Sequence, residues 1–130
     1  MACFEGSGIH AQMGIGAAPE GVITAAAVKA LNGEMQARFW PTNDEQIARL
    51  KKMGGDPNKV YSQDELASGS TIIFSATGVT DGDTLQGVRF FGGGVRTETL
   101  IVSMIGNELV HVGRKDWTHG YDKDKIEFRL

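Results

Sequence analysis

The feature that most constrains the fold of this chain is a glycine-rich turn at residues 14–21, which separates a segment with strand character from a helical one. Residues 9–15 predict a short strand that runs into the turn. Pro19 favours a helix start, because its missing N–H is not needed in the first helical turn. The helix is predicted to end at Leu31, before an Asn-Gly pair typical of a C-cap. The chain therefore predicts a strand, a tight turn and a helix near its start.

A second segment with strand character follows this helix. Residues 34–40 alternate polar and apolar side chains, which is the two-residue period of a strand, and Pro41 ends the pattern. Residues 9–40 together predict a β–turn–α–β unit, which nearly always crosses over right-handedly onto a parallel sheet. We therefore expect an α/β fold whose sheet begins with parallel pairing.

Caps, β-branched runs and glycine turns predict the remaining elements. Asn43 caps a charged helix that reaches Lys52, and Ser62 with Glu65 fits the capping box of a short helix. Apolar and β-branched runs predict strands over 71–77, 88–91, 97–105, 108–113 and, near the C-terminus, 126–129. A Gly-Asn pair at 106–107 is typical of a two-residue hairpin turn. The late part of the sheet is expected to be antiparallel, so the whole sheet is mixed.

Length and charge limit the class of protein. The 130 residues fit one domain, 1–130. A formal net charge of −3 predicts no attraction to nucleic acid or to acidic membranes. No apolar stretch approaches the length of a membrane span, and the N-terminus lacks the features of a signal peptide. Because Cys3 is the only cysteine, it has no internal disulfide partner, and we expect a soluble protein of the reducing cytoplasm.

The turn at 14–21 is the first candidate site. A helix N-terminus presents unpaired N–H groups and the positive end of the helix dipole, so it can hold a phosphate. The alternative is a tight turn in which Glu20 only complements the dipole, and local sequence alone favours that alternative. A dinucleotide-binding fingerprint is excluded, since Pro19 stands where its third glycine should be.

The loop Asp81-Gly82-Asp83 is the second candidate, as a metal loop. It lacks the further spaced oxygen ligands and the terminal glutamate of a calcium loop, so we interpret it as a solvated turn. Cys3 has no basic neighbour in the sequence that would activate a thiol.

Histidines and large aromatic residues are also spread along the chain. The histidines match no metal-ligand spacing; they are His10, His111 and His119. Three aromatic side chains could stack on a sugar ring, although ordinary packing is favoured for each: Trp40, Trp117 and Tyr121. The residues outside the 14–21 turn therefore give no independent site.

Four blocks of sequence occur in an order and spacing typical of one enzyme family. They are 14–22 (Gly-Ile-Gly-Ala-Ala-Pro-Glu-Gly-Val) with three alanines at 25–27, then 43–54, then 74–83, then 87–97. In these blocks the chain resembles class II fructose-1,6-bisphosphatases (GlpX type), including the cyanobacterial enzymes that also cleave sedoheptulose-1,7-bisphosphate. The resemblance covers nearly the whole chain and fades after about residue 105.

The resemblance implies a fold, a reaction and site residues. The fold is the C-terminal, three-layer α/β/α half of the sugar-phosphatase superfamily. The reaction is hydrolysis of the 1-phosphate of fructose-1,6-bisphosphate with Mg²⁺ or Mn²⁺, in gluconeogenesis or the Calvin cycle. Glu20 matches a metal ligand of the family, and Gly16 and Ala17 match its substrate-binding turn. The family has glycine where Ala17 stands, so a backbone contact there needs a negative φ at Ala17.

The resemblance also implies that part of the enzyme lies outside this sequence. Family members carry a longer N-terminal part with further metal-binding carboxylates, a catalytic threonine and basic phosphate-binding residues, and none of those motifs occurs here. We therefore assign no catalytic residue to this chain and expect weak metal binding and no efficient phosphatase activity from it alone. The alternative is a non-catalytic module of the same origin that forms a homo-oligomer or binds a sugar phosphate.

Overall fold

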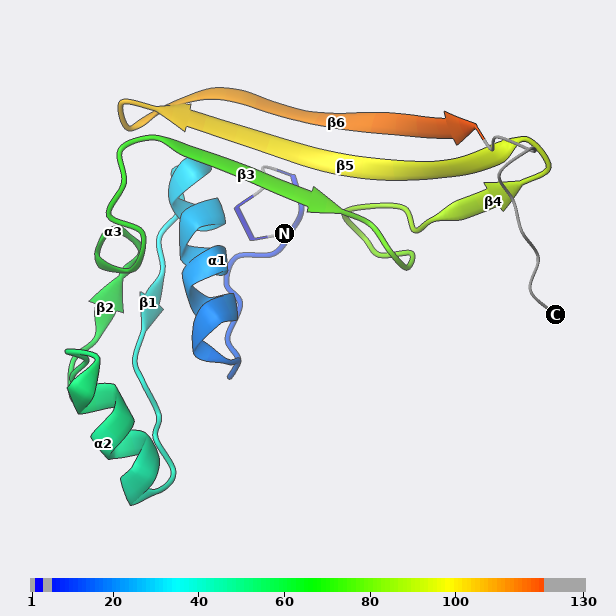
Figure 1. Ribbon diagram of the computed structural model, residues 1–130. Helices are drawn as coiled ribbons and strands as arrows, with labels where there is room; N and C mark the ends of the chain where they lie inside the picture. Colours follow the sequence, from blue (N-terminus) through cyan, green and yellow to red (C-terminus); the bar gives the residue numbers. More distant parts are fainter. Residues whose placement is uncertain (1, 4–5, 121–130) are drawn as a thin grey trace, which may run out of the picture.

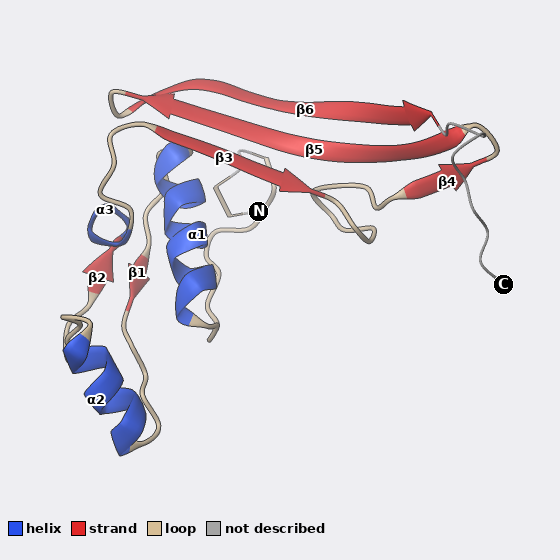
Figure 2. Ribbon diagram, viewed as in Figure 1, coloured by secondary structure: helices blue, strands red, loops and turns tan. Residues whose placement is uncertain are grey.

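The computed structural model describes residues 2–3 and 6–120. The elements occur in the order α1 (Ala18–Ala30), β1 (Gln36–Ala37), α2 (Asp44–Lys52), β2 (Tyr61–Ser62), α3 (Gln63–Leu66), β3 (Ile72–Thr77), β4 (Arg89–Phe91), β5 (Gly94–Ile105) and β6 (Glu108–Gly120). Helices and strands thus combine in one chain, as the predicted α/β class requires (Figure 1, Figure 2). The strand predicted at 126–129 lies outside the described residues.

The main sheet is organised around β5, which pairs with three other strands. β3 and β4 pair with it along one edge and β6 along the other, and all these pairings are antiparallel. The hairpin turn predicted between β5 and β6 is confirmed, with φ values of 61° at Gly106 and 65° at Asn107. Val110 is the extra residue of a bulge in β6, since Ser103 pairs with His111 but Met104 pairs with Leu109.

The parallel β–α–β unit predicted for residues 9–40 is not formed. Residues 9–15 adopt no strand, and β1 is two residues long and pairs antiparallel with β2. A strand exists only where a neighbour accepts and donates its backbone hydrogen bonds. Residues 9–15 have the side-chain pattern of a strand, but no described segment lies in register beside them.

Helix α1 covers one face of the sheet, where it contacts β3 and β5 (Figure 1). The core contains Ala30, Leu100, Val102 and Met104, which are buried, with Leu31, Ile72, Phe74 and Leu85 packed around them. The strand register explains this grouping, because Ile72 lies opposite Met104 and Phe74 lies opposite Val102, so all four share one face. Ala25 and Ala30 are fully buried, and their small side chains let the helix approach the sheet closely.

Both predicted helix caps are confirmed. The Asn43 side chain accepts a 2.9 Å hydrogen bond from the Gln46 N–H at the start of α2. Ser62 and Glu65 form the reciprocal capping box that begins α3. Among the described helices, none is long and apolar enough to cross a membrane.

The small core gives the first testable prediction. Met104 is 1% exposed at the centre of the core, whereas Met53 is 76% exposed beyond the end of α2. Met104→Ala should lower the free energy of unfolding by about 2–5 kcal/mol, because it leaves a cavity. The matched control Met53→Ala should change it by less than about 0.5 kcal/mol. Urea unfolding of the two variants measures the difference, and equal effects would contradict the core described here.

Candidate functional site

The turn before α1 is open to solvent along its whole length. Ala17 is the N-cap of α1 with φ −73° and ψ 159°, and its side chain makes no capping hydrogen bond. Pro19 lies at the start of the helix, and Glu20 lies in its first turn. The Gly21 N–H donates to the Ala17 carbonyl over 3.1 Å, which closes the first helical turn. The predicted helix start is therefore confirmed, although the strand before it is not.

The backbone conformation at Ala17 is compatible with alanine. Its φ of −73° lies in the extended region that any residue adopts, so the alanine found where the family has glycine causes no backbone strain. A Cβ atom built at Gly14 or Gly16 would meet nothing within 4 Å. Both glycines thus leave the solvent side of the turn free for another group to approach the backbone.

Electrostatics at this turn favour an anion but do not provide a metal site. The N–H groups of the first turn have no intrahelical partner, and the helix dipole adds positive potential there. The nearby Glu20 side chain is exposed. In the described part of the chain, no group of three or more histidine, cysteine or acidic side chains could hold a metal ion. A divalent cation needs several oxygen ligands, so Glu20 by itself does not constitute its site.

A second polar cluster lies in the loop between β3 and β4. Both carboxylate oxygens of Asp81 accept from the Arg89 guanidinium, at 2.7 and 2.8 Å, and Oδ1 also accepts from the Gly87 N–H at 2.9 Å. Glu98 on β5 accepts from the Gln86 N–H at 2.6 Å. The carboxylate of Asp81 is thus engaged by the loop backbone and by the first residue of β4, in agreement with the interpretation of Asp81-Gly82-Asp83 as a turn.

Glycines make this loop compact. A Cβ atom at Gly78 would overlap the Gln86 carbonyl oxygen, and one at Gly87 would lie 2.7 Å from the Thr80 carbonyl carbon. Both contacts are with backbone, which cannot move aside easily. Two segments of the loop therefore pass closer than any side chain allows, and this requirement explains two of the 18 glycines of the chain.

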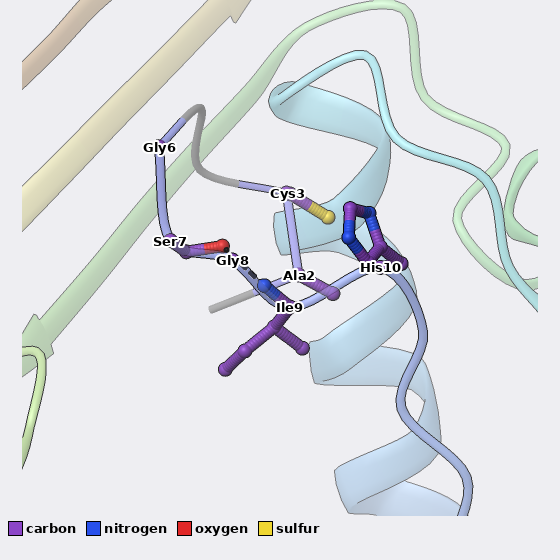
Figure 3. A pocket seen from close by; sticks show the side chains of 7 residues that line it. All are labelled: Ala2, Cys3, Gly6, Ser7, Gly8, Ile9 and His10. Carbon is purple, nitrogen blue, oxygen red and sulfur yellow. Dashed lines mark hydrogen bonds between the residues drawn. The ribbon is translucent and has the colours of Figure 1, made fainter.

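The histidines are not brought together. His10 lies in the N-terminal segment, whereas His111 and His119 lie on β6. His10 helps to line a hollow of about 240 Å³ formed by residues 2–3 and 6–10. In this hollow the Cys3 sulfur is directed toward the His10 ring, and Ile9 points away (Figure 3). A Cβ atom at Gly33 would lie 2.6 Å from the Cys3 sulfur, so the thiol packs against the end of α1.

The tryptophans each have a cation on one ring face. The Arg38 guanidinium lies 4.5 Å from the ring centroid of Trp40, and the Lys115 ammonium lies 4.7 Å from that of Trp117. Neither pair lies near the 14–21 turn in the sequence or on α1. The third aromatic candidate, Tyr121, lies outside the described residues.

Lys29 is a polar residue that the sequence did not single out. Its ammonium lies 3.0 Å from an Asp64 carboxylate oxygen and 3.0 Å from the Ala67 carbonyl, and its side chain is only 11% exposed. The pair ties α1 to α3 beside a hollow of about 300 Å³. A lysine inside a predicted helix carries no sequence signal for such a distant partner.

Comparison with known proteins identifies relatives of this chain. A family model described as bacterial fructose-1,6-bisphosphatase, glpX-encoded, matches residues 1–112. A Synechococcus sp. (strain JA-3-3Ab) protein named D-fructose 1,6-bisphosphatase class 2/sedoheptulose 1,7-bisphosphatase is 52% identical over 113 residues, which cover 77% of this chain and 33% of that protein. A Thermosynechococcus vestitus protein of the same name is 49% identical over 145 residues, which cover 100% of this chain and 41% of that protein. The chain thus spans about a third of the length of the curated relatives that it matches.

The Asp81–Arg89 pair gives a prediction about pH. The hydrogen bond from Arg89, and then that from the Gly87 N–H, lower the pKa of Asp81 below its usual value. A lowered pKa in the folded state stabilises the fold above the ordinary aspartate pKa of roughly 3.9, and this contribution is lost as the pH falls through the lower pKa. Asp81→Asn should therefore lower the Tm slightly at pH 7. The difference in Tm between the wild-type chain and the variant should disappear in acid.

The control for this prediction is Asp83→Asn, which changes the charge by the same amount two residues away. Thermal unfolding of the three proteins between pH 2 and pH 7 makes the comparison. A pH-independent gap for Asp81→Asn, or an equal gap for Asp83→Asn, would contradict the role given to the Arg89 contact.

Proposed function

The chain belongs to the glpX-encoded family of bacterial fructose-1,6-bisphosphatases, and on that premise we propose that it supplies the 14–21 turn to a sugar-bisphosphate phosphatase site. One observation carries the proposal. The family match includes the turn, and the turn leads into an open helix N-terminus with Glu20 exposed in its first turn. The proposed substrate is fructose-1,6-bisphosphate or sedoheptulose-1,7-bisphosphate, after the names of the relatives.

Each residue of the turn has a distinct part in this proposal. The backbone at Gly16 and Ala17 contacts the substrate, because neither residue places a bulky side chain over it. The unpaired N–H groups at the start of α1 favour a phosphate oxygen. Glu20 is one ligand of a Mg²⁺ or Mn²⁺ ion, whose chemistry in phosphate-ester hydrolysis is to activate water and neutralise charge. The remaining ligands come from outside this sequence.

We propose that the chain alone has no efficient phosphatase activity. A single exposed carboxylate binds a divalent cation weakly, and no other acidic, histidine or cysteine cluster accompanies it among residues 2–3 and 6–120. The proposed location is the cytoplasm, since a lone cysteine suits a reducing compartment.

Two proteins test this function. The first is the isolated chain, and the second is a full-length chimera in which this chain replaces the matching region of the Synechococcus relative. With fructose-1,6-bisphosphate and Mn²⁺, the chimera should release phosphate and the isolated chain should not. Glu20→Gln in the chimera should reduce phosphate release at least about 100-fold, which is the upper end of the loss from changing an outer-shell partner of a metal.

Glu34→Gln is the matched control in the chimera, because Glu34 is also exposed but lies beyond the far end of α1. It should leave phosphate release unchanged. Efficient turnover by the isolated chain that depends on Glu20 would overturn the proposal of inactivity. A chimera that is active and indifferent to Glu20→Gln would overturn the role of Glu20.

A second candidate function is a non-catalytic module that self-associates. The observation in its favour is the large number of exposed apolar side chains on the sheet, such as Ile73 at 74% and Phe90 at 76%. Exposed apolar patches tend to be covered by association. Light scattering over a range of concentrations should then show a homo-oligomer, and a monomer at high concentration would rule this function out.

A further inference from the structure

Residues 9–15 have the sequence of a strand but lack a neighbouring strand. Apolar side chains alternate along the segment at Ile9, Ala11, Met13 and Ile15. Met13 is 95% exposed and Ile15 is 92% exposed. No backbone N–H or carbonyl group of residues 10–16 forms a hydrogen bond to another described residue. A period-two apolar face with a free backbone is what an unpaired strand presents.

The helix beside this segment is also only half covered. Cys3 packs against Gly33 at the C-terminal end of α1, so the segment runs back along the helix to reach its N-terminus (Figure 1). The helix is apolar around most of its circumference, yet Val22 is 43% exposed and Ile23 is 58% exposed. A helix that is apolar on all sides is normally buried on all sides. The exposed apolar side chains of the segment and of the first turns of the helix include Met13, Ile15, Val22 and Ile23.

The total surface supports the same conclusion. The chain exposes 9996 Å², whereas a folded monomer of 14.0 kDa exposes roughly 6,700 Å². Residues 1, 4–5 and 121–130 lie outside the description, and even a fully unfolded stretch of that length would add only about 2,000 Å². More than about 1,000 Å² of excess surface thus belongs to the described residues, which is the size of half a stable interface.

We propose that residues 9–15 form a strand by adding to a sheet in the part of the family fold that lies outside this chain. Backbone hydrogen bonds would join the segment to that sheet, and Met13 and Ile15 would be buried together with Val22 and Ile23. The relatives indicate where the partner sheet comes from. The Synechococcus relative carries a similar region, 52% identical, that makes up 33% of a chain about three times as long as that region. We take the unmatched length as the source of the added sheet.

Hydrogen exchange of the backbone amides tests the added strand. In the isolated chain, the amides of residues 10–16 should exchange at nearly the rate of an unfolded peptide, because they have no acceptor. In the full-length chimera, the same amides should be protected at least about 100-fold, as strand amides are. The measurement needs no substrate or metal, so it is independent of the proposed phosphatase function.

Substitutions on the exposed face provide the second readout. Met13→Lys and Ile15→Lys should leave the Tm of the isolated chain unchanged, because both side chains are already more than nine-tenths exposed. In the chimera each should lower the Tm by several degrees, because the lysine would be buried. The control Met53→Lys, at a residue 76% exposed at the C-terminal end of α2, should change neither protein.

Four outcomes would overturn the proposal. One is fast exchange at residues 10–16 in a folded chimera, and another is an effect of Met13→Lys no larger than that of Met53→Lys. A chimera that does not fold, while the isolated chain does, would also contradict the added strand. Protection of these amides in a dimer of the isolated chain would identify a second copy as the occupant instead. A chimera that is protected but inactive would contradict only the phosphatase proposal.

Discussion

The pairing of β5 with three other strands is the interaction on which the rest of the structure depends. β5 is the only described strand that hydrogen-bonds along both of its edges, to β3 and β4 on one side and β6 on the other. It also supplies Leu100, Val102 and Met104, which are three of the four residues of the core cluster. Helix α1 packs on the apolar face that this strand shares with β3, and it also contacts α3. The 14–21 turn is in turn positioned by α1, so the geometry of the candidate site is set at a distance by β5.

Local signals in the sequence predicted local structure well. The cap at Asn43, the capping box at Ser62 and the Gly-Asn hairpin turn each depend on residues within four positions of one another, and all three are confirmed. The strand at 9–15 failed because pairing depends on a neighbour, which side-chain alternation does not reveal. The same limit applies to Lys29, whose partner Asp64 is 35 positions away. Sequence patterns report what a segment can do, and the surrounding fold decides whether it does so.

For the candidate site too, local features could be predicted from the sequence and long-range ones could not. The helix start at Pro19, with Glu20 in its first turn, followed from helix-start rules, and the negative φ at Ala17 removed the objection to alanine there. The completeness of the site could not follow from the turn alone, because ligands of one metal come from positions far apart in a sequence. The loop around Asp81 shows that residues with a ligand-like pattern can have a structural role instead. Its two aspartates look like ligands in the sequence, but the carboxylate of Asp81 is held by Arg89 and Gly87.

The bulge at Val110 has a consequence for how this chain behaves among its own copies. β6 is an edge strand of the sheet. The unpaired backbone groups of a long, flat edge strand can pair with other molecules, which leads to fibrils. The extra residue at Val110 distorts the backbone spacing near the hairpin, and Arg114, Lys115 and Asp116 place charges along the other half of the strand. Both features make β6 a poor template for the pairing of further strands. The β6 edge is therefore protected against edge-to-edge association. The unpaired segment 9–15 beside α1 stays available for strand addition.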